Sequence, residues 1–154
     1  MVAFNHLHTH SYYSFLEGLP SPSELVAKAA NFDMPALALT DRISMSGSIE
    51  FYLACREVGI QPILGLQIPV SPPLEVAPIG GDLILLARDL TGWRSLCRLS
   101  SAMQADASAD SITSLPFSDF AQETKGLICL TGGNQGNLDQ LIREGQDQAA
   151  RRYL

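Results

Sequence analysis

The sequence is poor in positive charge. Its 154 residues include 10 Lys and Arg against 16 Asp and Glu, which gives a formal net charge of −6. The imbalance is spread along the chain, because residues 1–70 and residues 71–154 contribute about equally to it. No basic stripe is present, and this argues against DNA binding by a broad positive face. We therefore expect any contact with DNA to be indirect.

Long apolar runs are also missing. No cationic segment is followed by a long apolar stretch, and Gly, Pro and Ser interrupt the longest uncharged stretches. The sequence therefore predicts neither a signal peptide nor a membrane span, and it favours a cytoplasmic protein without a membrane partner. The length and the 46% of hydrophobic residues fit one domain over residues 1–154.

Cysteine is scarce as well. Cys55, Cys97 and Cys129 lie far apart in apolar surroundings. An odd number of widely spaced cysteines is typical of reduced core thiols rather than of a disulfide framework or a zinc knuckle.

Helices and strands alternate along the sequence. Apolar residues at helical spacing predict helices at 22–32, 47–58, 91–103, 119–124 and 138–144. The first begins with a capping box, Ser21 to Glu24, and Ser118 is the expected cap of the fourth. Short apolar runs predict strands at 35–40, 62–70, 82–87 and 127–131, with a loop or ragged hairpin at 71–81 and a loop at 104–116. This alternation predicts an α/β fold with a parallel sheet or barrel.

In parallel α/β folds the chemistry lies beyond the carboxyl ends of the strands. That rule places His10, Asp41, Gln67 and the loop 132–136 on one side of the molecule. Asp82 opens its strand, so the same rule places it at the opposite end. The loop 132–136 matches no phosphate-binding motif and is interpreted as a connecting turn.

The three histidines of the chain, His6, His8 and His10, alternate within five positions. On a strand they would form one row, and two neutral imidazoles at this spacing suit a metal ion. Hydrogen-bonded structural histidines are an equal alternative for His8 and His10. Glu17, in the following loop, adds a carboxylate that favours the metal. Asp41 is either a fourth ligand or, as we favour, a turn-forming residue.

Seven segments carry a family resemblance: residues 4–18, 34–41, 47–52, 59–65, 83–89, 96–99 and 126–132. In this order they resemble the PHP (polymerase and histidinol phosphatase) domain of bacterial DNA polymerase III alpha subunits. The resemblance implies a distorted (β/α)7 TIM-type barrel, incomplete in this chain, which would be the N-terminal part of a single PHP-like domain. It also implies up to three metal ions at the carboxyl ends of the strands. Active members hydrolyse phosphoesters, and some polymerases use the cluster in 3′–5′ exonuclease proofreading.

Several metal positions of the family are altered here. His8 and His10 match its first motif, and Glu17 stands where an Asp before Gly is usual. Histidine is replaced by Arg42, by Asp82 and, beyond the following helix, by Gln104; glutamate is replaced by Gln67; and the family's late Asp-x-His motif is expected beyond Leu154. A guanidinium close to a divalent ion repels it by several kcal/mol even at an effective dielectric of about 20. We therefore expect no trinuclear cluster but at most one divalent ion (Zn, Mn or Mg), weakly held by His8, His10 and Glu17, with Arg42 paired to Glu17 or Asp41.

Two functions follow from this resemblance. The first is a degenerate PHP domain that acts as a scaffold or docking domain in DNA replication or repair synthesis, with the remainder of a polymerase alpha subunit or other replication proteins as partners. The alternative is a metal-dependent phosphoesterase (phosphatase or 3′–5′ exonuclease) that uses a His8/His10/Glu17 site, and a simple metal-binding module is a third option. No catalytic residue is assigned, and the chain alone is expected to be inactive as a polymerase. An open edge after the strand 127–131 would favour a homodimer.

Overall fold

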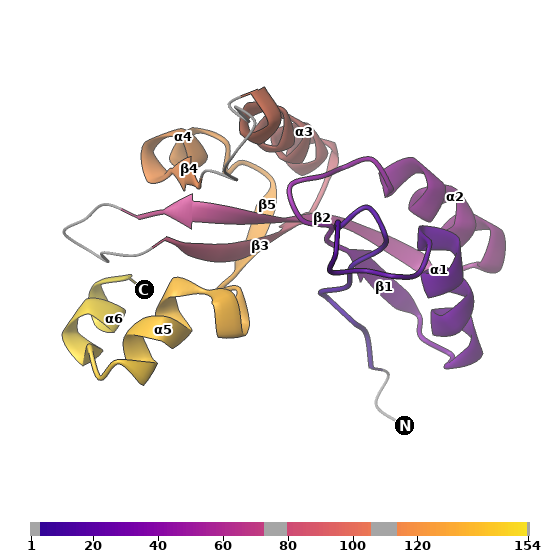
Figure 1. Cartoon of the computed structure of the whole chain (residues 1–154). Coiled ribbons are helices and arrows are strands. Elements are labelled where there is room, and N and C mark those ends of the chain that lie inside the picture. Colours follow the sequence, from indigo (N-terminus) through magenta and orange to yellow (C-terminus); the bar gives the residue numbers. More distant parts are fainter. Residues whose placement is uncertain (1–3, 73–79, 106–113, 154) are drawn as a thin grey trace.

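The computed structural model describes residues 4–72, 80–105 and 114–153. Its elements follow the chain in the order α1 (Pro22–Asn31), β1 (Ala36–Leu39), α2 (Ser48–Val58), β2 (Gln61–Ser71), β3 (Gly81–Ala87), α3 (Leu90–Ala105), β4 (Leu115–Pro116), α4 (Phe117–Gln122), β5 (Leu127–Leu130), a 3-10 turn (Gly133–Gln135), α5 (Asn137–Arg143) and α6 (Asp147–Tyr153) (Figure 1). The five predicted helices and the strands predicted at 35–40, 62–70, 82–87 and 127–131 are confirmed to within a few residues, whereas the strand predicted for the histidine segment is not. Most of the two predicted loops, at 73–79 and 106–113, lies outside the described residues.

Local signals fix the ends of the first two helices. Ser21 accepts a hydrogen bond from the Glu24 backbone N–H, and the Glu24 carboxylate accepts one from the Ser21 backbone, so the predicted capping box is present. Gly59 ends α2 with a φ of 79°, a conformation that glycine adopts without strain. The prediction for α4 is wrong in detail, because Ser118 lies inside the helix and Pro116 precedes it.

The sheet is mixed, and the prediction of a parallel sheet is wrong. Its strand order is β1-β2-β3-β5, with β4 added beside β2. β1 pairs parallel with β2, but β3 runs antiparallel to both β2 and β5. A parallel crossover needs a dozen or more residues, usually including a helix, and the link between β2 and β3 is too short for one. The two strands therefore form a hairpin, and this brings the start of β3 beside the end of β2.

The histidine segment does not form the predicted strand. It lies along β1, where the Ala38 N–H donates to the His6 carbonyl and the Thr40 N–H donates to the Thr9 carbonyl, each at 2.9 Å. The segment thus advances by three residues, from His6 to Thr9, while the chain beside it advances by two, from Ala38 to Thr40. This is the pattern of a β-bulge, and it breaks the alternation of side chains. The predicted single row of histidines is accordingly wrong: the His8 and His10 rings meet, whereas His6 packs edge-on against Phe4.

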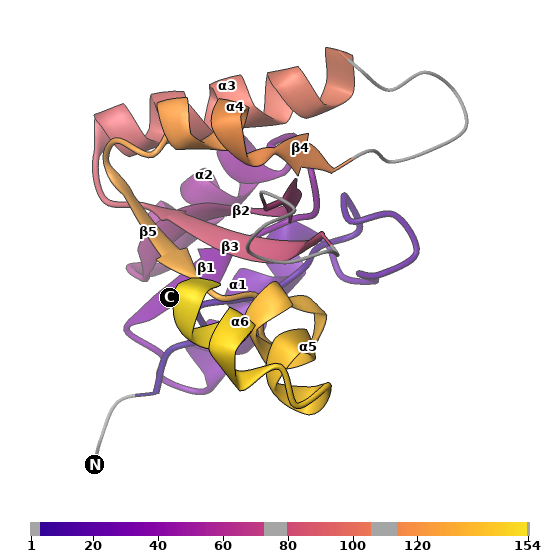
Figure 2. The same cartoon turned by 90° about the vertical axis from the view of Figure 1, so that its left-hand side faces the viewer.

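Helices cover the sheet from several sides. In Figure 2, α3 and α4 lie above β2, β3 and β5, whereas α5 and α6 lie below them. The main core lies between the sheet and the helices α3 and α4. It includes Leu66, Ile68, Leu85, Leu96, Leu99 and Phe120. A second core packs α1 and α2 on β1. No helix among the described residues is long and apolar enough to cross a membrane.

The cysteines are all free in the structure. Cys55 is fully buried in the core under α2, as predicted, and Cys97 is partly buried. Cys129 is exposed, so the core-thiol prediction is wrong for it. The reason is that β5 has no second strand neighbour among the described residues, and half of Ile128 is exposed as well. Pairing of this edge in a homodimer stays a prediction.

Candidate functional site

A cavity of about 630 Å³ opens on one side of the sheet, beside the end of β5. It is lined by His8, His10, Glu17, Gln67, Ile84 and Leu130 and by the turn 131–135. The predicted meeting of His10, Gln67 and the loop 132–136 is therefore confirmed. Asp41 lies beside this group but is buried.

Asp82 also belongs to this site, and its predicted place at the far end of the sheet is wrong. It opens β3, whose start pairs with Pro69 near the end of β2 because the two strands are antiparallel. The Asp82 carboxylate accepts a hydrogen bond from Gln67 Nε2 at 2.5 Å and forms an ion pair with Arg42. If β3 ran parallel to β2, Asp82 would lie at the opposite end of the sheet. The hairpin instead places the Asp82 carboxylate beside Gln67.

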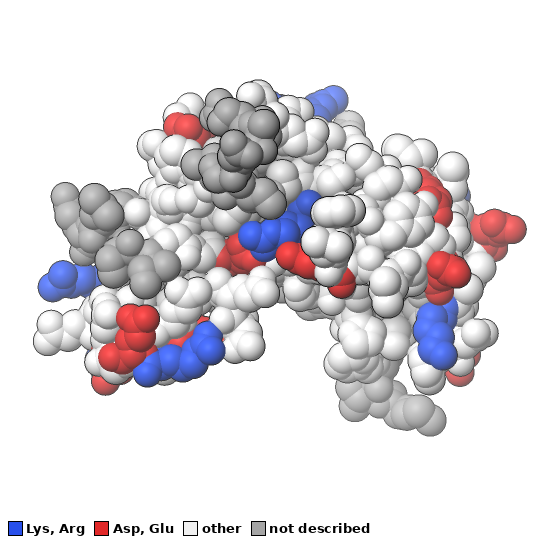
Figure 3. Space-filling view, viewed as in Figure 1, with Lys and Arg blue, Asp and Glu red and all other residues white. Residues whose placement is uncertain are grey.

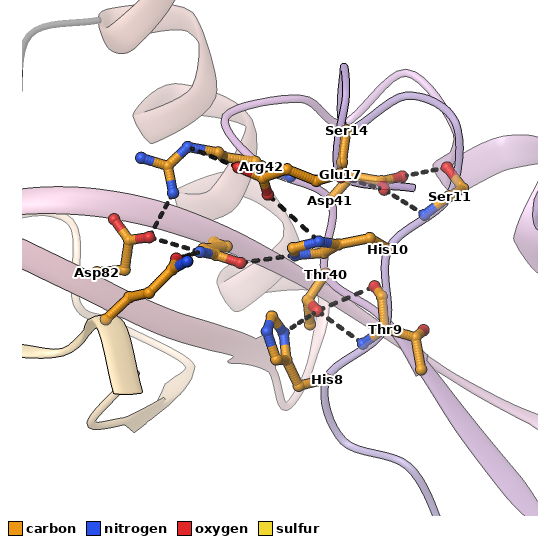
Figure 4. Close-up of polar contacts among 12 residues, drawn as sticks. His8, Thr9, His10, Ser11, Ser14, Glu17, Thr40, Asp41, Arg42 and Asp82 are labelled. Atoms are coloured by element: carbon orange, nitrogen blue, oxygen red, sulfur yellow. Dashed lines mark hydrogen bonds and ion pairs between the residues drawn. The ribbon is translucent and has the colours of Figure 1, made fainter. Parts of the chain in front are cut away.

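Five side chains close into a ring of polar contacts, which we name the polar ring. Arg42 Nη1 pairs with Asp82, Gln67 bridges Asp82 and His10, His10 reaches Glu17, and Glu17 returns to Arg42 Nε (Figure 4). The distances are 2.6 Å from Gln67 Oε1 to His10 Nε2, 3.4 Å from His10 Nδ1 to Glu17 Oε2 and 3.7 Å from Glu17 Oε1 to Arg42 Nε. In the ring one guanidinium contacts two carboxylates directly, and an amide and an imidazole link the same two carboxylates on the other side.

The direction of one hydrogen bond in the ring can be assigned. Gln67 Nε2 donates to Asp82, so the Gln67 amide oxygen faces His10. His10 Nε2 must then carry a proton to donate to that oxygen. Both nitrogens of His10 are thus engaged, one as a donor to Gln67 and the other beside Glu17.

Asp41 holds the neighbouring loop in place. Its carboxylate accepts hydrogen bonds of 2.7 Å from the Ser11 N–H, the Ser11 hydroxyl and the Ser14 hydroxyl. Ser14 in turn accepts the Arg42 backbone N–H at 3.0 Å. Asp41 therefore has a structural role, but the favoured prediction of a turn-forming residue is wrong, because its carboxylate bonds to a distant segment and not to its own turn. The predicted pairing of Arg42 is confirmed for Glu17 and not found for Asp41.

His8 has a different environment from His10. Its Nδ1 lies 2.8 Å from the Thr40 hydroxyl oxygen. The Thr40 hydroxyl donates to the Thr9 carbonyl, so it accepts from His8, and the lone pair of the neutral imidazole is on Nε2. Burial lowers the pKa of His8 below its ordinary value and His10 lowers it further, against the opposite effects of Asp82 and Glu17.

These contacts do not fit a polynuclear metal centre. His10 Nε2 is a donor, Asp82 is paired with a guanidinium, and Glu17 faces both Arg42 and His10. No group of three His, Cys, Asp or Glu in a metal-binding arrangement occurs within 4–72, 80–105 and 114–153. Binding of one ion by His8, His10 and Glu17 stays a prediction.

Residue reasoning alone missed two contributors to the site. The Thr40 hydroxyl contacts His8 Nδ1 and so orients its ring, and no sequence motif points to Thr40. Asp82 was marked only by the family resemblance, which expects a histidine at the start of this strand. Gln104, at another altered position, donates to the Ile43 carbonyl at 3.2 Å.

Comparison with known proteins identifies the family of this chain. Residues 6–154 match the model of the PHP domain family. The chain belongs to this family. It is 35% identical over 158 residues to the DNA polymerase III subunit alpha of Chlamydia trachomatis and 36% identical over 157 residues to that of Bacillus subtilis. These alignments cover 96% and 99% of the chain but only 12% and 13% of the two relatives.

The chain is also similar to an error-prone DNA polymerase and, more weakly, to a solved structure. An error-prone DNA polymerase of Symbiobacterium thermophilum is 36% identical over an alignment of 171 positions that covers 99% of the chain and 15% of the relative. Among solved structures, a putative metal-dependent phosphoesterase from Bifidobacterium adolescentis superposes with a TM-score of 0.49 at 17% identity, over 94% of this chain and 52% of that one. This PHP domain is thus related to polymerase chains several times its length.

Proposed function

We propose that this chain is a degenerate PHP domain in which the polar ring stands in place of the metal centre. It would form the N-terminal part of one PHP-like domain over residues 1–154, in a distorted (β/α)7 barrel that further strands complete. Its role would be that of a scaffold in DNA replication or repair synthesis in the cytoplasm. The observation that carries this proposal is the closed contact of Arg42 with both Glu17 and Asp82.

The electrostatic reason is that Arg42 already supplies the positive charge that the carboxylates need. Its Nη1 pairs with Asp82, and its Nε lies 3.7 Å from Glu17. A divalent ion about 4 Å from the guanidinium would be repelled by roughly 8 kcal/mol at an effective dielectric of 20. The guanidinium is always protonated, so no change of pH within the physiological range removes this repulsion.

The proposed partners are the remainder of a polymerase alpha subunit or other replication proteins. The support is that the chain spans only 12 to 15% of the polymerases to which it is similar. Contact with DNA is proposed to be indirect, because the Lys and Arg side chains on the face in Figure 3 are scattered and do not form a basic patch.

Hydrolysis of a chromogenic phosphoester in the presence of Mn²⁺ tests this proposal. We expect no metal-dependent turnover above that of the buffer with Mn²⁺ alone. Turnover by the wild-type chain that is lost in His10→Ala would overturn the proposal and establish the rival function.

That rival, a metal-dependent phosphoesterase using His8, His10 and Glu17, has one observation in its favour. The three residues line the same cavity, and the His8 and His10 rings lie 4.8 Å apart. One ion on the lone pair of His8 Nε2 and on Glu17 would activate water there. Binding of an ion without turnover would instead indicate a simple metal-binding module.

A further inference from the structure

The loop at residues 12–20, named here the apolar loop, exposes large hydrophobic side chains to solvent. Phe15 is 84% exposed, Leu16 90% and Leu19 94%, the three highest values among the large hydrophobic residues that the structure describes. In Figure 2 this indigo loop projects away from the sheet at the right of the view. Single exposed apolar residues are ordinary, but three on one projecting loop are typical of a binding surface.

Hydrogen bonds hold the loop in one conformation. The Tyr12 N–H donates to the Pro20 carbonyl at 2.9 Å and closes the loop at its base. The N–H groups of Glu17 and Gly18 both donate to the Ser14 carbonyl at 3.0 Å. A Cβ on Gly18 would overlap the Ser11 carbonyl, so this turn requires glycine.

Two buried or partly buried charges anchor the loop to the sheet. Asp41 accepts from both the Ser11 and the Ser14 side chains, and Glu17 is fixed by Arg42 and His10. The strain at Leu16, which has a φ of 64°, is tolerated within this frame. The loop is therefore organised before any partner arrives, and binding loses little conformational entropy.

Two carboxylates, those of Glu24 and Glu50, lie at the base of the loop. Glu50 accepts from the Tyr12 hydroxyl at 3.3 Å and from the Ser23 hydroxyl at 2.8 Å, and Glu24 accepts from Ser21. We name Glu24 and Glu50 the acidic pair. The sequence has no Lys or Arg before Lys28, and the nearby Arg42 is already paired.

From these contacts we infer that the apolar loop is a docking surface for a basic amphipathic helix of a partner protein. The apolar stripe of such a helix would cover Phe15, Leu16 and Leu19, and its flanking Lys and Arg would face the acidic pair. A second copy of this chain would set two acidic pairs against each other, and carboxylates repel the phosphates of lipids and nucleic acids. This inference rests on the proposed scaffold function and names the surface that carries it.

The test uses a fluorescent peptide that forms an amphipathic helix of Leu and Lys only. We expect saturable binding to the wild-type chain at physiological ionic strength by fluorescence anisotropy. The variant Phe15→Ser/Leu16→Ser/Leu19→Ser should bind at least about tenfold more weakly, because each side chain is a contact of the hydrophobic stripe. Glu24→Gln/Glu50→Gln should weaken binding severalfold and flatten its salt dependence, with the Glu24 cap preserved by glutamine.

Matched controls distinguish binding at the apolar loop from non-specific binding of the peptide. Leu53→Ser/Ile142→Ser removes exposed apolar side chains from α2 and α5 and should leave the affinity unchanged. A Leu/Glu peptide and a scrambled Leu/Lys peptide should not bind. Where circular dichroism finds the triple variant misfolded, Phe15→Ser/Leu19→Ser gives the same comparison without changing the strained Leu16.

Three results would overturn the inference: no binding of the Leu/Lys peptide, equal binding by the loop variants, or binding of the loop to phosphatidylcholine vesicles in preference to the peptide. None of these three results would contradict the proposed degenerate metal site. Conversely, metal-dependent phosphoester hydrolysis would overturn the proposed function whatever the peptide does.

Discussion

Arg42 and Asp82 form an ion pair although one follows a parallel strand and the other opens an antiparallel one. The pair is possible because β3 runs back along β2 and brings its first residues to the place where β1 ends. Gln67, on β2 between them, donates to the same Asp82 oxygen. The ion pair and Gln67 together therefore link three neighbouring strands beside the cavity.

Replacing one partner of this ion pair should lower the free energy of unfolding by more than replacing both partners. Arg42→Met leaves the nearly buried Asp82 carboxylate without a cation, and Asp82→Ala leaves Arg42 with Glu17 alone. In a double-mutant cycle followed by urea unfolding, we expect a coupling free energy of about 1 to 3 kcal/mol. Additive effects of the two substitutions would contradict the pairing.

Asp41→Ala should be among the most destabilising single changes in the chain. It leaves the Ser11 N–H and the Ser11 and Ser14 hydroxyls without their acceptor in a buried place. We expect a loss of more than about 2 kcal/mol in the free energy of unfolding, and a smaller loss for Asp41→Asn, which keeps one oxygen. Glu57→Gln, on an exposed position of α2, is the control and should be within about 0.5 kcal/mol of wild type.

Stability should fall as the pH is lowered through the ordinary pKa of histidine. Burial and His10 lower the pKa of His8 in the folded chain, so the unfolded chain binds its proton more readily. The contribution of neutral His8 is fully present above about pH 6.5 and is lost toward its lower folded pKa. Urea unfolding at several pH values should show a weaker dependence for His8→Asn, whose amide can still donate to Thr40. His6→Asn is the control outside the cavity, and an identical pH dependence of His8→Asn and wild type would refute the assignment.

The cysteines should differ in reactivity. Cys55 is fully buried, and burial raises the pKa of its thiol to about 11. In Cys97→Ser/Cys129→Ser, we expect a chromogenic disulfide reagent to modify Cys55 only as the chain unfolds. In Cys55→Ser, the exposed Cys129 should react in the folded state. Rapid and complete modification of Cys55 under native conditions would show that the core under α2 is open.

Much of the fold could be predicted from local sequence. Ser21, Pro22 and Glu24 define the start of α1, and Gly59 defines the end of α2, because capping and left-handed turns depend on neighbouring residues. The direction of β3 could not be predicted from its apolar run, since buried parallel and antiparallel strands have the same composition. The length of the link from β2 was the only available signal, and it favoured a hairpin.

The candidate site was predicted in part. His10, Gln67 and the turn after β5 line one cavity on the same side of the molecule, as predicted, although Gln67 lies within β2 and His10 lies outside any strand. The misplacement of Asp82 follows directly from the wrong direction of β3. The departure of His6 from the row has another cause, a bulge set by hydrogen bonds to β1, which no residue in the segment signals.

The account depends most on Arg42 filling the place of a metal, and calorimetric titration with Mn²⁺ and Zn²⁺ tests this most directly. We predict at most one ion per chain, with a Kd weaker than about 10 μM, and an affinity at least about tenfold higher in Arg42→His/Gln67→Glu, which removes the guanidinium and adds two ligands. Stoichiometric and tight binding of two or three ions by the wild-type chain would contradict it.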